Sequence, residues 1–252
     1  MINTVSYRVA KPSRVFIHLL SVQKVGRRFL RPQEHSYPSV YTKTMTKTIA
    51  VFGATGRTGR VFVDVALQAG WHIRAGVRSN TLPAHENLTV VTCDITKPDD
   101  VANVLRGCDA VASLLGHGFK SPAKLQTDAM RVITEEMKLL NIRRIVSLTG
   151  TGVRRPGDKI NIIDRLANMA IAIVDPARVN DGKAHVDVLE QSQLDWTVVR
   201  VLKLTNGKAE QYRLTRGGPA KTLVSRRTVA DALVSVLYDN KYIHSLPVVS
   251  KK

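Results

Sequence analysis

The chain has 252 residues, of which 44% are hydrophobic and 23% are charged, and its formal net charge is +18. This size and balance suit one globular domain with a sizeable core. Two cysteines, Cys93 and Cys108, cannot form a disulfide framework, and both stand in apolar segments that predict buried free thiols. No uncharged apolar run approaches the ~18 residues of a membrane span. The dispersed basic residues form no nucleic-acid motif, so we expect neither a membrane nor a nucleic acid as a partner.

Residues 1–44 differ from the rest of the chain, with eight Lys or Arg residues against one acid, Glu34. The part 15–30 has the composition of a basic amphipathic helix, which is compatible with a mitochondrial transit peptide. The alternative is an upstream extension of the reading frame, with Met45 as the natural start of a cytoplasmic protein. Under either hypothesis we expect 1–44 to be disordered or a targeting segment, and the folded domain to span 45–252.

From residue 45 on, predicted strands and helices alternate. Strands are expected at 48–52, 71–77, 88–93, 110–115, 144–148, 195–201 and, as a final edge strand, 246–249. Helices are expected at 61–69, from a Thr96 N-cap to about Gly107, from Ser121 and Pro122 onwards, over 160–192 with a break near 175–176, and at 228–237 behind a Ser225 cap. Repeated βαβ units predict an α/β fold, a Rossmann-like doubly wound parallel sheet in a single domain.

The stretch that follows the first strand has the glycine spacing G-x-x-G-x-x-G. One glycine lets the chain turn out of the strand, one lets the backbone approach a pyrophosphate, and one lets the helix pack close to the sheet. The helix N-terminus then offers free N–H groups to the phosphates. The motif predicts dinucleotide binding, and its candidate cofactor contacts are Gly53, Thr55, Gly56, Arg57, Thr58 and Gly59.

The end of the second strand predicts which dinucleotide is bound. NAD sites carry an acidic residue there, which binds the ribose 2′-hydroxyl. This chain has Arg78 and Ser79 instead, with no acid nearby. A guanidinium matches a 2′-phosphate, and Arg57 can approach the same phosphate. We therefore expect the cofactor to be NADP(H) rather than NAD(H).

Four more residues are candidate cofactor contacts because they close neighbouring strands. Asp94 and Ile95 end the third strand, where adenine would lie, and Asp94 can accept from the exocyclic amine or serve only as a turn residue. Leu115 and Gly116 end the fourth strand, where the backbone passes near the cofactor's ribose.

Together these motifs resemble the atypical short-chain dehydrogenase/reductase family, and more closely its NAD(P)H-binding, NmrA-like and flavin-reductase-like branch. The resemblance covers about residues 46–250 and rests on Gly53–Gly59, Val77-Arg78, Cys93-Asp94-Ile95, Leu194–Arg200 and the Ser-Arg-x-x-Val-Ala-Asp start at Ser225. It implies a single Rossmann-like domain, a bound nicotinamide nucleotide and, in active members, hydride transfer.

Active members of this family typically use Ser, Tyr and Lys, with Tyr-x-x-x-Lys on a helix. The matching lysine here is Lys183, the tyrosine position holds Val179, and the serine position falls near Thr149. A valine donates no proton, so two hypotheses remain. The protein is an NADPH-dependent reductase of a small flavin, quinone or carbonyl acceptor, or it is an NmrA-like redox sensor that binds NADP(H) and acts through a protein partner.

His117 is a further catalytic candidate because it follows the fourth strand at its carboxyl end, where ligands gather; the alternative is a plain loop histidine. The histidines and cysteines show no metal-ligand spacing, so no metal is expected. We expect a small-molecule substrate whose identity is set mainly by residues 153–180 and 202–222.

Overall fold

The computed structural model describes residues 47–78, 82–118, 121–220 and 222–252, and the sheet is built outward from strand β1 (Thr48–Phe52). Alternate side chains of β1 enter different layers of the core. Ile49 and Val51 belong to one hydrophobic cluster, and Ala50 and Phe52 belong to the other. A strand covered on both faces is apolar throughout rather than alternating, as this one is. Residues 1–44 and Ser79 lie outside the described residues.

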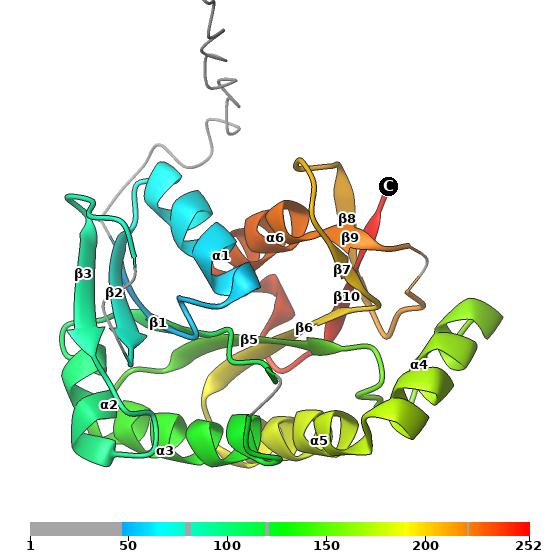
Figure 1. Cartoon of the computed structure of the whole chain (residues 1–252), viewed down its shortest axis with the longest axis horizontal. Coiled ribbons are helices and arrows are strands. Elements are labelled where there is room, and N and C mark those ends of the chain that lie inside the picture. Colours follow the sequence, from blue (N-terminus) through cyan, green and yellow to red (C-terminus); the bar gives the residue numbers. More distant parts are fainter. Residues whose placement is uncertain (1–46, 79–81, 119–120, 221) are drawn as a thin grey trace, which may run out of the picture. The chain divides into compact units, whose positions relative to one another are not determined.

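The main sheet has eight strands in the order β3-β2-β1-β4-β5-β6-β10-β8 (Figure 1). All neighbours are parallel except β10 and β8, which pair antiparallel. The order 3-2-1-4-5-6 is that of a doubly wound Rossmann-like sheet, as predicted. The strands are β2 (His72–Val77), β3 (Leu88–Thr92), β4 (Ala110–Ser113), β5 (Arg144–Gly150), β6 (Asp195–Val201), β8 (Tyr212–Arg216) and β10 (Pro247–Lys251).

Helices cover both faces of this sheet (Figure 1). One layer holds α1 (Arg57–Gln68) and α6 (Arg226–Tyr238), and the other holds α2 (Pro98–Leu105), α3 (Leu125–Leu139) and α5 (Pro176–Gln191). Helix α4 (Ile162–Val174) stands at one end, to the right in Figure 1. Two short strands, β7 (Leu204–Thr205) and β9 (Val224–Ser225), pair with each other, and a 3-10 turn spans Asn240–Tyr242. Within the described residues, no helix is long and apolar enough to cross a membrane.

The final strand is not an edge strand, and this corrects the prediction for 246–249. Strand β10 lies between β6 and β8, and Pro247 to Lys251 pair with Arg216 to Tyr212. The edge strand β8 comes from the part of the chain in which we found no motif. Its short alternation, apolar at Tyr212 and Leu214 and polar at Arg213 and Thr215, is the signal that predicts a half-buried strand.

Two predicted helix starts also differ from the structure. Lys97, not Thr96, is the N-cap of α2, because the Thr96 hydroxyl donates to Asp94 Oδ1 at 2.7 Å. Helix α3 begins at Leu125, after a turn in which Ser121 Oγ accepts from the Gly118 N–H at 2.8 Å. The predicted Ser225 cap is confirmed, since its side chain accepts from the Thr228 N–H at 3.1 Å.

Cys93 and Cys108 are free and buried. Burial raises the pKa of Cys93 to about 11, with a smaller contribution from Asp100, and burial raises the pKa of Cys108 to about 12. Both side chains therefore act as small apolar core residues rather than as reactive thiols.

Candidate functional site

The turn after β1 is shaped by two close backbone approaches. Gly53 has a φ of +80°, and a Cβ there would lie 2.7 Å from the carbonyl carbon of Leu114 at the end of β4. A Cβ on Gly59 would meet the Gly53 carbonyl oxygen and would lie 2.9 Å from the Ala54 Cα. Gly53 therefore makes the turn, and Gly59 brings α1 against the strand. Gly56 is the remaining glycine and is exposed, as the pyrophosphate position should be.

The N-terminus of α1 is open to an anion. Its N-cap is Gly56, which provides no side-chain cap, and its first turn holds no acid. The first N–H groups of a helix have no intrahelical partner, and the positive end of the dipole lies there. Thr55, Gly56 and Arg57 are exposed beside this end, and Thr58 is half-buried. The geometry is that of a phosphate-binding helix terminus.

Arg78 directly follows β2 and is exposed, as its predicted role requires. Asp94, which follows the neighbouring strand β3, lies close enough to interact with it electrostatically, and its side chain accepts from the Thr96 hydroxyl and, at 3.0 Å, from the Thr96 N–H. These hydrogen bonds lower the pKa of Asp94, and the nearby Lys97 and Arg78 lower it further. Asp94 is thus a turn residue in this structure, and its contact with adenine stays a prediction.

Arg226, at the start of α6, is a site residue to which the sequence motifs gave no role. Its Nη1 donates to Asn206 Oδ1 at 2.6 Å, while its Nε is buried and has no hydrogen-bond partner in the described part of the chain. Burial lowers the pKa of Arg226, and the neighbouring Arg57 lowers it further. The guanidinium groups of Arg57 and Arg226 repel each other, so the space near both of them favours an anion. The Ser-Arg motif marked the position, but only the fold places it next to the glycine loop.

The remaining predicted cofactor residues lie at the carboxyl ends of β3 and β4. Ile95 is half-buried and packs on the core. Leu115 packs on the same core cluster, and its carbonyl oxygen accepts from Gln126 Nε2 at 2.7 Å. Gly116 is exposed. The carboxyl ends of parallel strands are where open α/β sheets bind ligands.

A pocket of about 550 Å³ lies between the β5–α4 loop, α4 and α5. Its apolar lining comes mainly from Ile160, Ile162, Met169 and Val179, and its cations are Arg154, Arg165 and Lys183. This volume suits a small organic molecule. Nine of the eleven lining residues belong to the predicted segment 153–180, and none belongs to 202–222.

Two of the three catalytic candidates flank this pocket. Lys183 lines it one helical turn after Val179, so both face the same side of α5. Thr149 is buried near the end of β5, and a Cβ on Gly182 would lie 3.0 Å from its Oγ1. Thr149 therefore lies beside Gly182, which precedes Lys183 on α5, and valine occupies the tyrosine position on the same helix.

His117, the third candidate, is held by a carboxylate. Its Nε2 lies 2.8 Å from Asp181 Oδ2, and the Asp181 side chain is fully buried. Asp181 also accepts from the N–H groups of Gln126 and Thr127 and from the Thr127 hydroxyl, so an α5 residue caps the N-terminus of α3. Burial acts to raise the pKa of Asp181, but these hydrogen bonds outweigh it and hold that pKa below its ordinary value. His117 thus has a fixed orientation, and its role as an acid stays a prediction.

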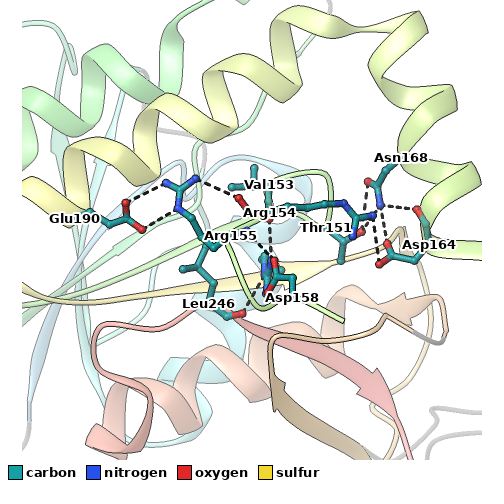
Figure 2. Close-up of polar contacts among 10 residues, drawn as sticks. Thr151, Val153, Arg154, Arg155, Asp158, Asp164, Asn168, Glu190 and Leu246 are labelled. Atoms are coloured by element: carbon teal, nitrogen blue, oxygen red, sulfur yellow. Dashed lines mark hydrogen bonds and ion pairs between the residues drawn. The ribbon is translucent and has the colours of Figure 1, made fainter. Parts of the chain in front are cut away.

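Hydrogen bonds and ion pairs bind the loop between β5 and α4 to three elements, β6, α5 and α4 (Figure 2). Buried Arg200 on β6 donates to both carboxylate oxygens of Asp158, at 2.5 and 2.8 Å. Arg155 donates to Glu190 on α5 at 2.8 Å. Asn168 on α4 donates to Thr151 Oγ1 at 3.0 Å and to Asp164 Oδ1 at 2.6 Å. One wall of the pocket is therefore fixed by charged side chains that are far apart in the sequence.

A nicotinamide dinucleotide fits what the chain provides. Gly56 is exposed and has no side chain, the α1 N-terminus is uncapped, and two arginines lie beside it. No group of three or more histidine, cysteine or acidic side chains that could hold a metal occurs within the described ranges.

Solved structures of known proteins have the same fold. A short-chain dehydrogenase/reductase from Veillonella parvula, solved in complex with NADP, superposes with a TM-score of 0.69 at 20% identity over 82% of this chain and 95% of that one. ChuY, an anaerobilin reductase from Escherichia coli O157:H7, superposes with a TM-score of 0.66 at 17% identity over 81% and 97%. These likenesses show a shared fold.

A sequence relative is an uncharacterized chloroplastic protein of Arabidopsis thaliana, 36% identical over 81 residues. The match spans 30% of this chain and 29% of the plant protein, well under two thirds of its length. The NAD(P)H-binding family model matches residues 53–240, which is most of the chain and includes the whole glycine turn. The chain therefore belongs to the NAD(P)H-binding family and has the Rossmann-like fold of the short-chain dehydrogenases/reductases.

Proposed function

We propose that the protein is an NADP(H)-dependent reductase that acts on a flavin, quinone or carbonyl acceptor held in the pocket of residues 152–183. One observation carries this proposal: the pocket wall formed by Val179 and Lys183 lies on the helix that matches the family's catalytic helix. The family match supports nicotinamide nucleotide binding, and the NADP complex of a structural neighbour supports the choice of NADP.

The residues that bind the cofactor divide into two groups. The uncapped N-terminus of α1 and the Gly53 turn receive the pyrophosphate through backbone N–H groups. Arg78, with Arg57 and Arg226 near the glycine loop, provides guanidinium donors for a 2′-phosphate. When bound, NADPH supplies a hydride to an acceptor.

The pocket side chains orient the acceptor rather than protonate it. Val179 lies where a tyrosine would donate a proton and donates none, and Lys183 has the position that holds the nicotinamide ribose. The proton that completes the reduction therefore comes from solvent, which suits flavins and quinones because their reduced forms take up protons readily. Catalysis then depends mainly on proximity and orientation.

The test is a titration of the full chain with NADPH and NADH, followed by an NADPH-oxidation assay with FMN, a naphthoquinone and an aldehyde. We expect tighter binding of NADPH than of NADH, and turnover with the flavin or the quinone. Absence of binding would falsify the proposal.

The same valine favours one alternative, a non-catalytic NADP(H) sensor that acts through a protein partner. A sensor binds NADPH as tightly but turns over none of the three acceptors. Val179→Tyr separates the two proposals further. In a reductase it adds a proton donor beside the acceptor and should raise aldehyde reduction at least tenfold, since general acids contribute about 10²-fold or more. If the protein is a sensor, Val179→Tyr does not change the rate of aldehyde reduction.

A further inference from the structure

Helix α4 presents its apolar side chains to solvent. Of the twelve large exposed hydrophobic residues in the described part of the chain, eight lie on 160–174. Ile162, Ile173 and Val174 are 77%, 78% and 84% exposed. Scattered exposed hydrophobic residues are normal on a protein surface, but a cluster of eight on one helix and its approach marks an interaction site.

Two of the three polar side chains of α4, Asp164 and Asn168, face the protein instead. Asp164 is buried and accepts from Asn168, and Asn168 donates to Thr151 on the β5–α4 loop (Figure 2). At 100° per residue, Ile162, Leu166, Met169 and Ile173 form one stripe, and Ile163 and Val174 widen it. The helix therefore has its polar side toward the fold and a broad apolar arc away from it, the reverse of an ordinary surface helix.

The charges around this arc are mainly positive. Lys159 and Arg165 are exposed, and no ion pair of theirs is seen among the residues that the structure describes. The acids of the same segment are neutralised, because Asp164 lies 3.5 Å from Arg154, Asp175 pairs with Arg178, and Asp158 pairs with Arg200. Arg165 stands at the edge of the apolar arc, where its stem can cover apolar surface while its charge stays in water.

We propose that α4 docks on an anionic lipid surface, with its apolar arc at the level of the acyl-chain boundary and its basic rim against the headgroups. A wide apolar arc bordered by Lys and Arg is the pattern of a helix that lies in a membrane interface. The surface attracts the rim because it is negatively charged. Five of the residues that line the pocket belong to this helix, so docking would bring the pocket to the membrane surface.

The charge distribution disfavours the two protein occupants closest at hand. In a symmetric dimer across α4, the basic rims of the two copies would meet and repel. The segment 1–44, with eight Lys or Arg residues against one acid, would meet the same repulsion if it folded over α4. An anionic surface complements both the rim and the apolar arc.

The test places an indole on the arc and reads its surroundings directly. The full-length variant Ile173→Trp is mixed with vesicles of equimolar phosphatidylcholine and phosphatidylglycerol, and with vesicles of phosphatidylcholine alone. We expect its added emission to shift to the blue and to be quenched by brominated lipid in the anionic vesicles. The signal should be at least tenfold weaker with the neutral vesicles. Trp71 and Trp196 are buried, so subtracting the wild-type spectrum isolates the new indole.

Leu139→Trp is the matched control, because Leu139 is 74% exposed and lies at the far end of α3. Its emission should not change, even if residues 1–44 bind the vesicles. Adding Arg165→Gln to Ile173→Trp should weaken partitioning about fivefold, since each basic residue near an anionic surface contributes ~1 kcal/mol. Equal responses to the two kinds of vesicle, no response to either, or a blue shift without lipid that depends on protein concentration would each overturn the proposal.

Discussion

The cofactor half of the molecule, β1 to β4 with α1, and the pocket half, β5 to α5, are held together in different ways. In the cofactor half, the shape comes from backbone contacts, such as the approach of Gly53 to the carbonyl of Leu114. In the pocket half, the shape comes from side chains, such as Arg200 on Asp158 and Asp181 on the first turn of α3. A shape that depends on close backbone contacts requires glycines at a fixed spacing. A shape that depends on side-chain contacts can use partners at any distance in the sequence.

The largest effect on stability is expected at Gly53, in the turn after β1 whose shape depends on backbone contacts. Gly53→Ala should lower the free energy of unfolding by about 3 kcal/mol, since a positive φ costs ~1–2 kcal/mol and the clash with Leu114 adds to it. Gly70→Ala is the control, because Gly70 has a φ of +81° and a Cβ added there would have no neighbour within 4 Å. It should cost only about 1 kcal/mol. Urea denaturation measures both, and equal losses would show that close approach to β4 contributes nothing.

The second prediction concerns Asp181 in the pocket half, whose shape depends on side-chain contacts. Asp181→Asn should lower the free energy of unfolding at neutral pH by about 2 kcal/mol, because the carboxylate accepts four hydrogen bonds and caps α3. The folded-state pKa of Asp181 lies below its ordinary value of 3.8. Its stabilising contribution is therefore complete above that value and is lost as the pH falls through the lower, folded-state pKa.

The difference between wild type and Asp181→Asn should thus be constant at neutral and mildly acidic pH and shrink below 3.8. Asp128→Asn is the control. Asp128 is exposed on α3, the helix that Asp181 caps, and it pairs with Arg131. It should change stability by less than about 0.5 kcal/mol. A difference that grows as the pH falls would contradict the assignment.

The third prediction concerns the cofactor half and tests whether Arg78 selects NADPH over NADH. Arg78→Glu should weaken NADPH binding relative to NADH by about 10- to 100-fold, because a phosphate contact is replaced by charge repulsion. Calorimetric titration with both nucleotides gives this ratio. Arg106→Glu, an exposed arginine at the end of α2, should leave the ratio unchanged. An unchanged ratio in Arg78→Glu itself means that this arginine does not contact the 2′-phosphate.

The smallest effect is expected at Arg226. Arg226→Gln should weaken NADPH binding about fivefold, as expected for the loss of one charge interaction worth ~1 kcal/mol, and should change NADH binding by less than twofold. Asn206→Ala removes the hydrogen-bond partner of Arg226 but keeps its charge, so it should leave NADPH affinity intact. Equal losses in the two variants would indicate a structural role.

The fold was predictable because its signals are local. The apolar strand at 48–52, the glycine turn and the Ser225 cap each lie within a few residues of the structure that they determine. The predicted elements therefore appear in the predicted order. The edge position of β8 depends on pairing with β10, more than thirty residues later, so the apolar run at 246–249 was wrongly placed at the edge.

The candidate site was predictable only in its cofactor half. The glycine spacing and Arg78 stand in one βαβ unit, whereas Arg226 reaches Arg57 only through the packing of α6 on α1. The apolar arc of α4 was missed for a different reason. We judged contact with a membrane from the length of an apolar run, and this criterion detects a helix that crosses a bilayer but not one that lies on it. The periodicity of 162, 166, 169 and 173 was the available signal.

Strand β8 has a consequence for the solubility of the protein. Without it, β10 would be the sheet's edge, with its main-chain groups open to other chains and with Val248 and Val249 beside them. Strand β8 replaces that apolar edge with one that carries exposed Arg213 and Arg216. Positive charge on an edge strand opposes strand-to-strand aggregation. Cleavage or deletion within 206–219 should therefore lead to aggregation even where the cofactor turn stays folded.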